Sequence, residues 1–383
     1  MTAERPFIIA LVASLSVGAS ASERGLFGDV ADDRHAWAVH DMNRPRPLQI
    51  TARLGEPPSD AIVLFDGTKE SVDANWCTGD GRPVKWTVKD GAFVCTPKSG
   101  PAYTKRPFGD AQFHVEWMIS VSDTKGDGQF AGNSGVLLMG KYEIQILNSF
   151  DPDPTEKVRR NYPDGIAGAV YGQSPPLVNA CFPAGVWQTY DIVFHQPRWK
   201  NGVRIYPGTV SVFLNGVLVQ DNRELEGPTD YRRRRKPVEH AELLPWTLQD
   251  HHAPVRFRNI WIREIPSMTA NTTDGGPYVD VADVRALRNR TAAALFALVD
   301  IERASKDDVK HSLETLAYST GAKYVNAAKT VCENFRKRTS NGGADGGMSA
   351  QDRKDVAGWF NVLRRCHSID LSAFPLAGEV GVR

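Results

Sequence analysis

Alternating strand patterns run through residues 61–265 and leave few architectures open to this part of the chain. The segments "QFHVEWMISV" and "WQTYDIVFH" alternate apolar and polar residues, as strands with one buried face do. In "WTVKDGAFVC" and "VSVFLNGVLVQD", Asp90-Gly91 and Asn215-Gly216 separate two such runs, and these dipeptides favour two-residue hairpin turns. With about ten strand patterns and no convincing helix over about 200 residues, the sequence predicts an antiparallel two-sheet β-sandwich at residues 58–266.

The sequence on either side of the predicted sandwich has a different character. Residues 22–57 show few apolar periodicities, so we expect an N-terminal extension that lies along a domain or is loose. Residues 267–383 contain "VADVRALRNRTAAALFALVDIERA" and "VKHSLETLAYSTGAKYVNAAKTVCENFRKR", in which apolar residues recur at helical spacing. They predict a helical appendage that packs or docks a protein partner, which the sequence does not identify.

The first 21 residues have the features of a secretory signal peptide. Arg5 precedes an apolar run over residues 7–17, and Ala19-Ser20-Ala21 supplies a small-residue cleavage site. We therefore expect cleavage after Ala21 and a secreted or periplasmic protein. The apolar run is shorter than the ~20 residues that a membrane-spanning helix needs, and no later segment predicts a membrane span.

The charges of the chain are almost balanced, with 46 Lys and Arg against 45 Asp and Glu in 383 residues. This balance supplies no overall field that would attract nucleic acid or an anionic membrane, so it favours a neutral partner. The basic run Arg232–Lys236 lacks the interleaved aromatic residues of a nucleic-acid surface. It is typical of a solvated loop.

Five cysteines suggest a disulfide framework for an exported protein. Cys77 with Cys95, and Cys332 with Cys366, are the pairings that we expect, although the spacing leaves the connectivity open. Cys181 is the odd cysteine, and it is predicted to be a buried thiol because no nearby group favours a thiolate.

The stretch "GKYEIQILNSF" (residues 140–150) inserts polar side chains into what otherwise reads as a core strand. Side chains alternate along a strand, so Glu143 and Gln145 share one face while Ile144 and Ile146 share the other. Glycanases of the sandwich type place two carboxylates about 5 Å apart on such a strand. Here the partner positions hold Gln145 and Asn148, which neither protonate a leaving group nor form a glycosyl ester. The usual two-carboxylate mechanism is therefore disfavoured.

Two other segments carry polar groups that suit a binding site. "GQFAGNSGVLLMG" places Asn133 before a strand, between glycines that allow a ligand to approach the backbone. "LPWTLQDHHAPVRFRNIWI" places Gln249 and His251 ahead of the last strand, and a His beside an acid is a candidate general base or metal ligand. The alternative is a loop cap with exposed histidines. Trp187 and Trp261 are predicted to be core residues.

A series of segments also resembles one family in both order and spacing. The chain is similar to the 3-keto-disaccharide hydrolase domain family over residues 58–266, and the resemblance does not extend to the helical tail. It rests on the segments "VLFDGT", "WTVKDGAFVC", "GNSGVLLMGKYEIQIL", "GAVYGQSPPLVNA", "GVWQTYDIVFHQPR", "VSVFLNGVLVQDN" and "LQDHHAPVRFRNIWIREI".

The resemblance implies a concanavalin A-like jelly-roll sandwich that cleaves glycosides whose C3 hydroxyl has been oxidised to a ketone. The ketone acidifies the C2 proton, so one base, Glu143 or His251, removes it and the C1 substituent leaves by β-elimination. Water then adds back, which completes a net hydrolysis. The remaining polar groups suit sugar hydroxyls and the ketone. Those proposed to bind substrate are Asn133, Gln145, Tyr171 and Gln249.

One departure from the family concerns a metal. Family members often carry Asp where this chain has Asn148, which puts metal dependence in doubt. The sequence leaves open a divalent ion held by Glu143 and His251, because an enolate oxygen is a good hard ligand.

Two other classes of function fit the same sequence. The first is a lectin-like module that binds carbohydrate without turnover, since fold does not fix function. The second is a scaffold in which the sandwich docks a helical partner, which would make the tail the active part.

Overall fold

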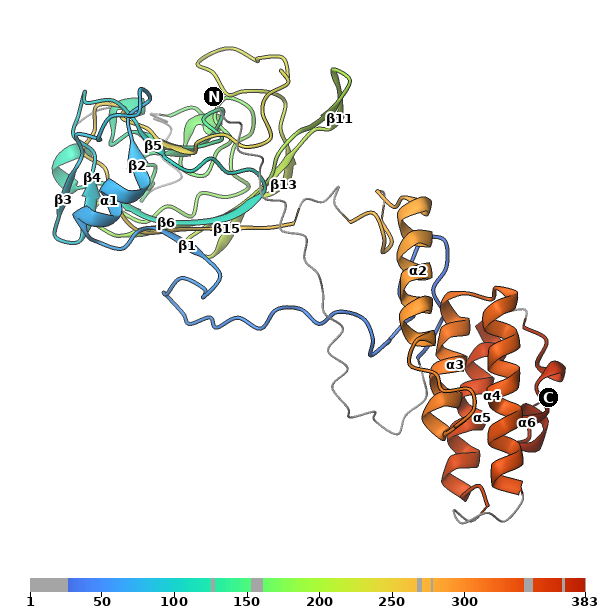
Figure 1. Cartoon of the computed structure of the whole chain (residues 1–383). Coiled ribbons are helices and arrows are strands. Elements are labelled where there is room, and N and C mark those ends of the chain that lie inside the picture. Colours follow the sequence, from blue (N-terminus) through green and yellow to red (C-terminus); the bar gives the residue numbers. More distant parts are fainter. Residues whose placement is uncertain are drawn as a thin grey trace, which may run out of the picture. The chain divides into compact units, whose positions relative to one another are not determined.

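The computed structural model describes residues 27–124, 128–152, 161–266, 271–276, 278–340, 347–366 and 369–382. The predicted signal peptide, residues 1–21, lies outside the described residues. The chain divides into two compact units (Figure 1). One is Gln49–Ser267, and the other combines residues up to Leu48 with those from Met268 onward.

The unit Gln49–Ser267 is built from two antiparallel sheets. Among the described residues, the larger sheet consists, in spatial order, of β13 (Val217–Glu224), β12 (Thr209–Leu214), β9 (Gln188–His195), β6 (Ala111–Met118), β15 (Arg256–Glu264), β4 (Ala92–Val94) and β3 (Thr87–Lys89). In addition, β1 (Ile62–Phe65) pairs with β15. The smaller sheet runs β2 (Trp76–Cys77), β5 (Ala102–Thr104), β14 (Thr247–Leu248), β7 (Ser134–Leu138) and β8 (Tyr142–Ile146). A separate hairpin joins β10 (Arg198–Lys200) to β11 (Val203–Tyr206). The predicted antiparallel sandwich with C-terminal helices is confirmed.

Both predicted hairpin turns are present. Asp90-Gly91 connects β3 to β4, and Asn215-Gly216 connects β12 to β13. All four residues have positive φ, between 51° and 78°. A type I′ turn requires this conformation at both central residues, and it matches the twist of the paired strands.

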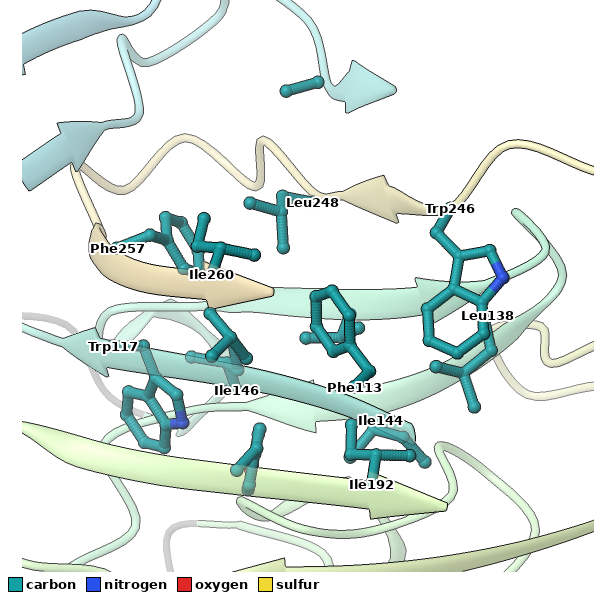
Figure 2. Close-up of a cluster of buried hydrophobic side chains, with 14 of the residues drawn as sticks. Phe113, Trp117, Leu138, Ile144, Ile146, Ile192, Trp246, Leu248, Phe257 and Ile260 are labelled. Atoms are coloured by element: carbon teal, nitrogen blue, oxygen red, sulfur yellow. The ribbon is translucent and has the colours of Figure 1, made fainter. Parts of the chain in front are cut away.

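The core lies between the two sheets (Figure 2). On β6, every second side chain is buried, which directs Phe113 and Trp117 inward. They meet Ile144 and Ile146, which the smaller sheet contributes from β8. Since side chains alternate along a strand, Glu143 stands on the opposite, outer face of the smaller sheet.

Sequence reasoning missed one short helix in this unit, α1 (Lys69–Asn75). The helix begins because the side chain of Thr68 accepts a hydrogen bond from the backbone N–H of Ser71. The helix buries only Val72. One buried position in seven residues gives no helical period for a sequence pattern to reveal.

The second unit contains α2 (Val281–Phe296), α3 (Lys306–Tyr318), α4 (Ala322–Ser340), α5 (Ala350–Cys366) and α6 (Pro375–Glu379). Its core also includes Phe27, Ala31 and Ala38 from the first part of the N-terminal extension. The backbone of Ala36 donates to the carbonyl of Thr273, which ties this arm to the segment before α2. We call residues 27–48 the N-terminal arm. No helix among the described residues is long and apolar enough to cross a membrane.

The structure leaves Cys77 and Cys95 as free thiols, so the expected pairing of these two is wrong here. Cys77 pairs with Tyr103 across β2 and β5, whereas Cys95 is buried in the core. The thiol of Cys95 instead forms a hydrogen bond with Asp250. Cys181 is a buried thiol, as predicted, and Cys332 is also free. The side chain of Cys366 is outside the described residues.

Two Gly→Ala substitutions are expected to change stability in opposite directions. At Gly216 and at Gly358, no atom lies within 4 Å of the position that an added methyl group would take, so packing does not decide the effect. Gly216 has a φ of 78°, so Gly216→Ala should destabilise the sandwich by about 1 kcal/mol. Gly358 lies inside α5, where Gly358→Ala should stabilise the helical unit by about 0.5–1 kcal/mol. Urea unfolding monitored by circular dichroism measures both, and equal signs would contradict the backbone explanation.

Candidate active site on the outer face of the smaller sheet

Strand register brings the predicted polar residues together on the outer face of the smaller sheet. Cross-strand partners share a face, and β7 pairs with β8 through Leu137–Glu143 and Gly135–Gln145. The backbone N–H of Gln249, just beyond β14, donates to the carbonyl of Gly135 at 2.9 Å. Gln145, Gly135 and Gln249 therefore form one row across three strands, and Glu143 lies in the next row.

Glu143 is a buried carboxylate, with 8% of its surface exposed. A Cβ atom at Gly135 would lie 2.4 Å from its Oε1, so the glycine on β7 leaves the space that the carboxylate fills. Burial raises the pKa of Glu143 to about 7, although a hydrogen bond with Gln249 acts in the opposite direction. A carboxyl group with this pKa exchanges a proton readily near neutral pH.

Two loops hold the backbone of Glu143 on the side away from β7. Its N–H donates to Oγ1 of Thr229 at 3.1 Å, and its carbonyl accepts from the N–H of Tyr171 at 3.1 Å. The N–H of Gln145 likewise donates to the carbonyl of Ala169 at 3.0 Å. Residues 168–171 thus extend the pairing beyond β8, and they place Tyr171 beside Glu143.

The carboxamides form a network with two unused acceptors. Nε2 of Gln145 donates to Oε1 of Gln129 at 2.8 Å, and Nδ2 of Asn133 donates to the carbonyl of Gln129 at 2.8 Å. Oδ1 of Asn133 and Oε1 of Gln249 are buried and have no hydrogen-bond partner among the described residues. Since buried polar atoms are rarely left unsatisfied, these two oxygens are suited to accept hydrogen bonds from a ligand's hydroxyl groups.

Two tyrosines, Tyr162 and Tyr171, lie near Glu143, and Tyr231 lies near these two. The hydroxyl groups of Tyr162 and Tyr171 are 2.7 Å apart. Burial raises the pKa of each of these two phenols, and the charges of Glu143 and Tyr231 add to the effect. Sequence reasoning found Tyr171 but missed Tyr162, Tyr231 and Gln129. Tyr162 and Tyr231 are far from β8 along the chain, and no local pattern marks them.

His251 lies two residues beyond Gln249 but is not joined to Glu143. In the part of the chain that the structure describes, no hydrogen bond or ion pair connects these two side chains. Nδ1 of His251 is buried without a partner there, and its ring packs against that of His252. The neighbouring Asp250 accepts from the N–H groups of Gly100 and His252, so its role is to hold the loop. No group of three or more His, Cys, Asp or Glu side chains that suits a metal occurs among the described residues.

A second cluster of charged groups lies on the outer face of the larger sheet. Nδ1 of His114 is 2.7 Å from Oδ1 of Asp191, and Nε of Arg258 is 2.6 Å from Oε2 of Glu116. Burial would lower the pKa of His114, but hydrogen bonds with Asp191 and Glu116 outweigh it and raise that pKa to about 9. These charges satisfy one another, so the cluster is structural.

The two tryptophans that were predicted to be core residues lie on this same outer face. Trp187 is half-buried, and the guanidinium of Arg258 lies 4.1 Å from its ring centroid. Its assignment to the core is therefore wrong. Trp261 is buried, but it is stacked on His114 and lies outside the core cluster. Both rings pack against charged side chains, which a hydrophobicity pattern does not anticipate.

A family described as the 3-keto-alpha-glucoside-1,2-lyase-like domain matches residues 60–263, more than half of the chain. The chain belongs to this family. The match confirms the resemblance seen in the sequence. In this 3-keto-alpha-glucoside-1,2-lyase-like domain, Glu143 and Gln249 lie within the matched region, whereas the helical unit lies outside it.

One solved structure agrees with the family assignment. The chain is 36% identical to a candidate glycosyl hydrolase from Parabacteroides distasonis ATCC 8503, with a TM-score of 0.54 over 60% of this chain and 98% of that one. A second candidate glycosyl hydrolase from the same organism is 22% identical, with a TM-score of 0.39 over 54% and 94% of the two chains. No match was found among curated proteins. The 3-keto-alpha-glucoside-1,2-lyase-like domain and its relatives support a carbohydrate-active role.

Proposed function

We propose that this protein cleaves glycosides that carry a ketone at C3, with Glu143 as the base. The observation that carries the proposal is a single buried carboxylate, with a pKa of about 7, among carboxamide and phenol groups. A general base works best when its pKa lies near the working pH. The family description, a 3-keto-alpha-glucoside-1,2-lyase-like domain, supports the same chemistry.

The reaction proceeds in two balanced stages. Glu143 takes the proton from C2, the C2–H electron pair forms an enolate with the C3 ketone, and the bond between C1 and the glycosidic oxygen breaks. The leaving oxygen receives a proton from protonated Glu143 or from His251. Water then adds across the resulting C1=C2 double bond, with OH at C1 and H at C2. No electrons are gained or lost, so a separate oxidation must supply the ketone.

A glycosidase with two carboxylates fits the site less well. Such an enzyme needs a second carboxyl group ~5 Å or more from the first. On β7 and β8, no other position of this outer face holds a carboxyl group. The neighbouring positions hold Gln145 and Gly135 instead, and neither transfers a proton.

The surrounding residues have binding roles in this proposal. The unsatisfied oxygens of Asn133 and Gln249 accept hydrogen bonds from sugar hydroxyls. The paired phenols of Tyr162 and Tyr171 donate to the C3 oxygen as negative charge develops there. Gln145 holds Gln129 in place, since their side chains form a hydrogen bond.

A panel of 3-keto glycosides beside their unoxidised parents tests the proposal. We expect release of the aglycone from the keto sugars, with transient absorbance from the unsaturated ketone, and no cleavage of the parents. Chromatography and ultraviolet absorbance measure both. Cleavage of the parents alone would overturn the mechanism. Binding without any turnover would favour the lectin-like alternative, which the unsatisfied acceptors also suit.

A further inference from the structure

A loop with five consecutive basic residues is joined to the backbone of Glu143 through Thr229. The run Arg232–Lys236 is exposed, and it follows Thr229, whose Oγ1 accepts from the N–H of Glu143. The N–H and hydroxyl of Thr229 both donate to the carbonyl of Lys141, at 2.9 and 3.1 Å. The basic loop, which we define as residues 227–236, is thus anchored to β8 directly next to the candidate base.

The basic loop has a defined shape. Nε2 of Gln173 donates to the carbonyl of Gly227 at 2.7 Å, which ties the loop to the segment that carries Tyr171. A Cβ atom at Gly227 would lie 2.2 Å from the carbonyl oxygen of Arg235, so the two ends of the loop pass in contact. Arg232 has a φ of 58°, an uncommon conformation for a residue other than Gly. The basic side chains are therefore presented from a closed loop.

Most of the positive charge on this loop is not neutralised. Arg235 forms an ion pair with Asp230. Arg232 lies over the ring of Tyr231 at 5.0 Å. Within the described residues, Arg232, Arg233, Arg234 and Lys236 have no ion pair with a carboxylate. Like charges placed side by side repel one another. All five basic side chains are exposed, so the packing of the protein does not require them. The local charge therefore differs from the nearly balanced charge of the whole chain.

We propose that the basic loop selects substrates that carry anionic groups, namely glycans with carboxylate or sulfate substituents on the sugar units next to the cleaved bond. This inference rests on the proposed function of Glu143. Arginine side chains suit it, because a guanidinium binds a carboxylate or sulfate through two parallel hydrogen bonds. Contacts of Thr229 and Gln173 hold this loop against the start of β8 and the segment that carries Tyr171. Tyr231 is the one aromatic residue in the basic loop, whereas single-stranded nucleic acid is bound by several stacking rings.

The test compares two double variants that each remove two exposed positive charges. Arg233→Gln/Arg234→Gln alters the basic loop, and Lys85→Gln/Lys89→Gln is the control in the larger sheet, at and before β3. Calorimetry on the full chain measures binding of a glucuronic acid tetramer, a sulfated glucose tetramer, a neutral glucose tetramer and a DNA tetramer. Circular dichroism checks that each variant is folded.

We expect the unaltered protein to bind at least one acidic glycan about tenfold more tightly than the neutral one at low salt. This preference should weaken as ionic strength rises, because exposed charges are screened. The loop variant should lose most of the preference, and the control should keep it. Comparison of the glucuronic acid tetramer with the sulfated glucose tetramer identifies which anionic group the basic loop binds.

Equal binding of acidic and neutral tetramers would overturn the inference, as would an equal loss in both variants or a preference for DNA. The proposed reaction is tested separately, because binding is measured without turnover. Cleavage of 3-keto glycosides without an acidic preference would reject only the role of the basic loop. An acidic preference without cleavage would reject only the reaction.

Discussion

Glu143→Gln is expected to lower turnover of a 3-keto glycoside by about 10²- to 10⁴-fold and to change its binding much less. The amide keeps the size of the side chain, and therefore its fit beside Gly135, but it cannot take a proton. Steady-state kinetics and calorimetry on one substrate separate the two effects. His251→Ala, measured in parallel, shows whether a second group helps the leaving oxygen. If both variants keep more than about a tenth of the original rate, the base lies elsewhere.

The pH dependence of activity and of stability provides two further tests of Glu143→Gln. Glu143 acts as a base only when ionised, so kcat/KM should rise with pH through about 7, and the variant should lack this rise. Stability should change in the opposite sense. The pKa is higher in the folded protein than its ordinary 4.5, so the resulting stabilisation is fully present below that value and is lost as pH rises through about 7. Relative to the variant, the unaltered protein should lose on the order of 3 kcal/mol between about pH 4 and pH 8.

Gly135→Ala is expected to reduce activity by about 10²-fold while the sandwich remains folded. The added methyl group would lie 2.4 Å from Oε1 and 2.9 Å from Cγ of Glu143, so the carboxylate must move. The backbone of Gly135 does not have the positive φ that disfavours alanine, and the displaced atoms belong to a flexible side chain. Kinetics together with thermal unfolding distinguish a misplaced base from a damaged fold.

Gly140→Ala serves as the matched control for Gly135→Ala, because it alters the turn between the same two strands. Its φ of 63° should make alanine destabilising by about 1 kcal/mol, yet its nearest neighbours are 3.6 Å away and do not include Glu143. We therefore expect reduced stability and retained activity in this variant. In the background of Glu143→Gln, Gly135→Ala should cause little further loss, since the two act on one group. If Gly135→Ala lowers activity by the same factor in both backgrounds, its effect does not act through Glu143.

The parts of the fold that follow from local chemistry were predictable from the sequence. Asp90-Gly91 and Asn215-Gly216 each specify a turn that a neighbouring pair of strands requires. The alternation around Ile144 places Glu143 on the outer face without any knowledge of the partner sheet. The helix α1 was not predictable in this way, because its cap at Thr68 is a single hydrogen bond and it buries one side chain.

The candidate site was predictable only where its residues lie on strands. Gln145 and Gln249 follow from strand register, but Tyr162 and Tyr231 lie in loops. How these loops are placed depends on contacts such as that between Thr229 and the N–H of Glu143, 86 positions apart. The basic loop was read as a solvated loop, which its exposure matches. Its position beside the candidate base is visible only in three dimensions.

The packing of the N-terminal arm with the C-terminal helices makes the helical unit discontinuous in the chain. The helices α2–α5 are synthesised only after all of Gln49–Ser267. Until then the arm residues Phe27, Ala31 and Ala38 lack the side chains against which they pack. At 5–20 residues per second this synthesis takes roughly 10 to 45 s. The sandwich is therefore tethered to the helical unit at both of its ends, and a protease must cut both connections to release it.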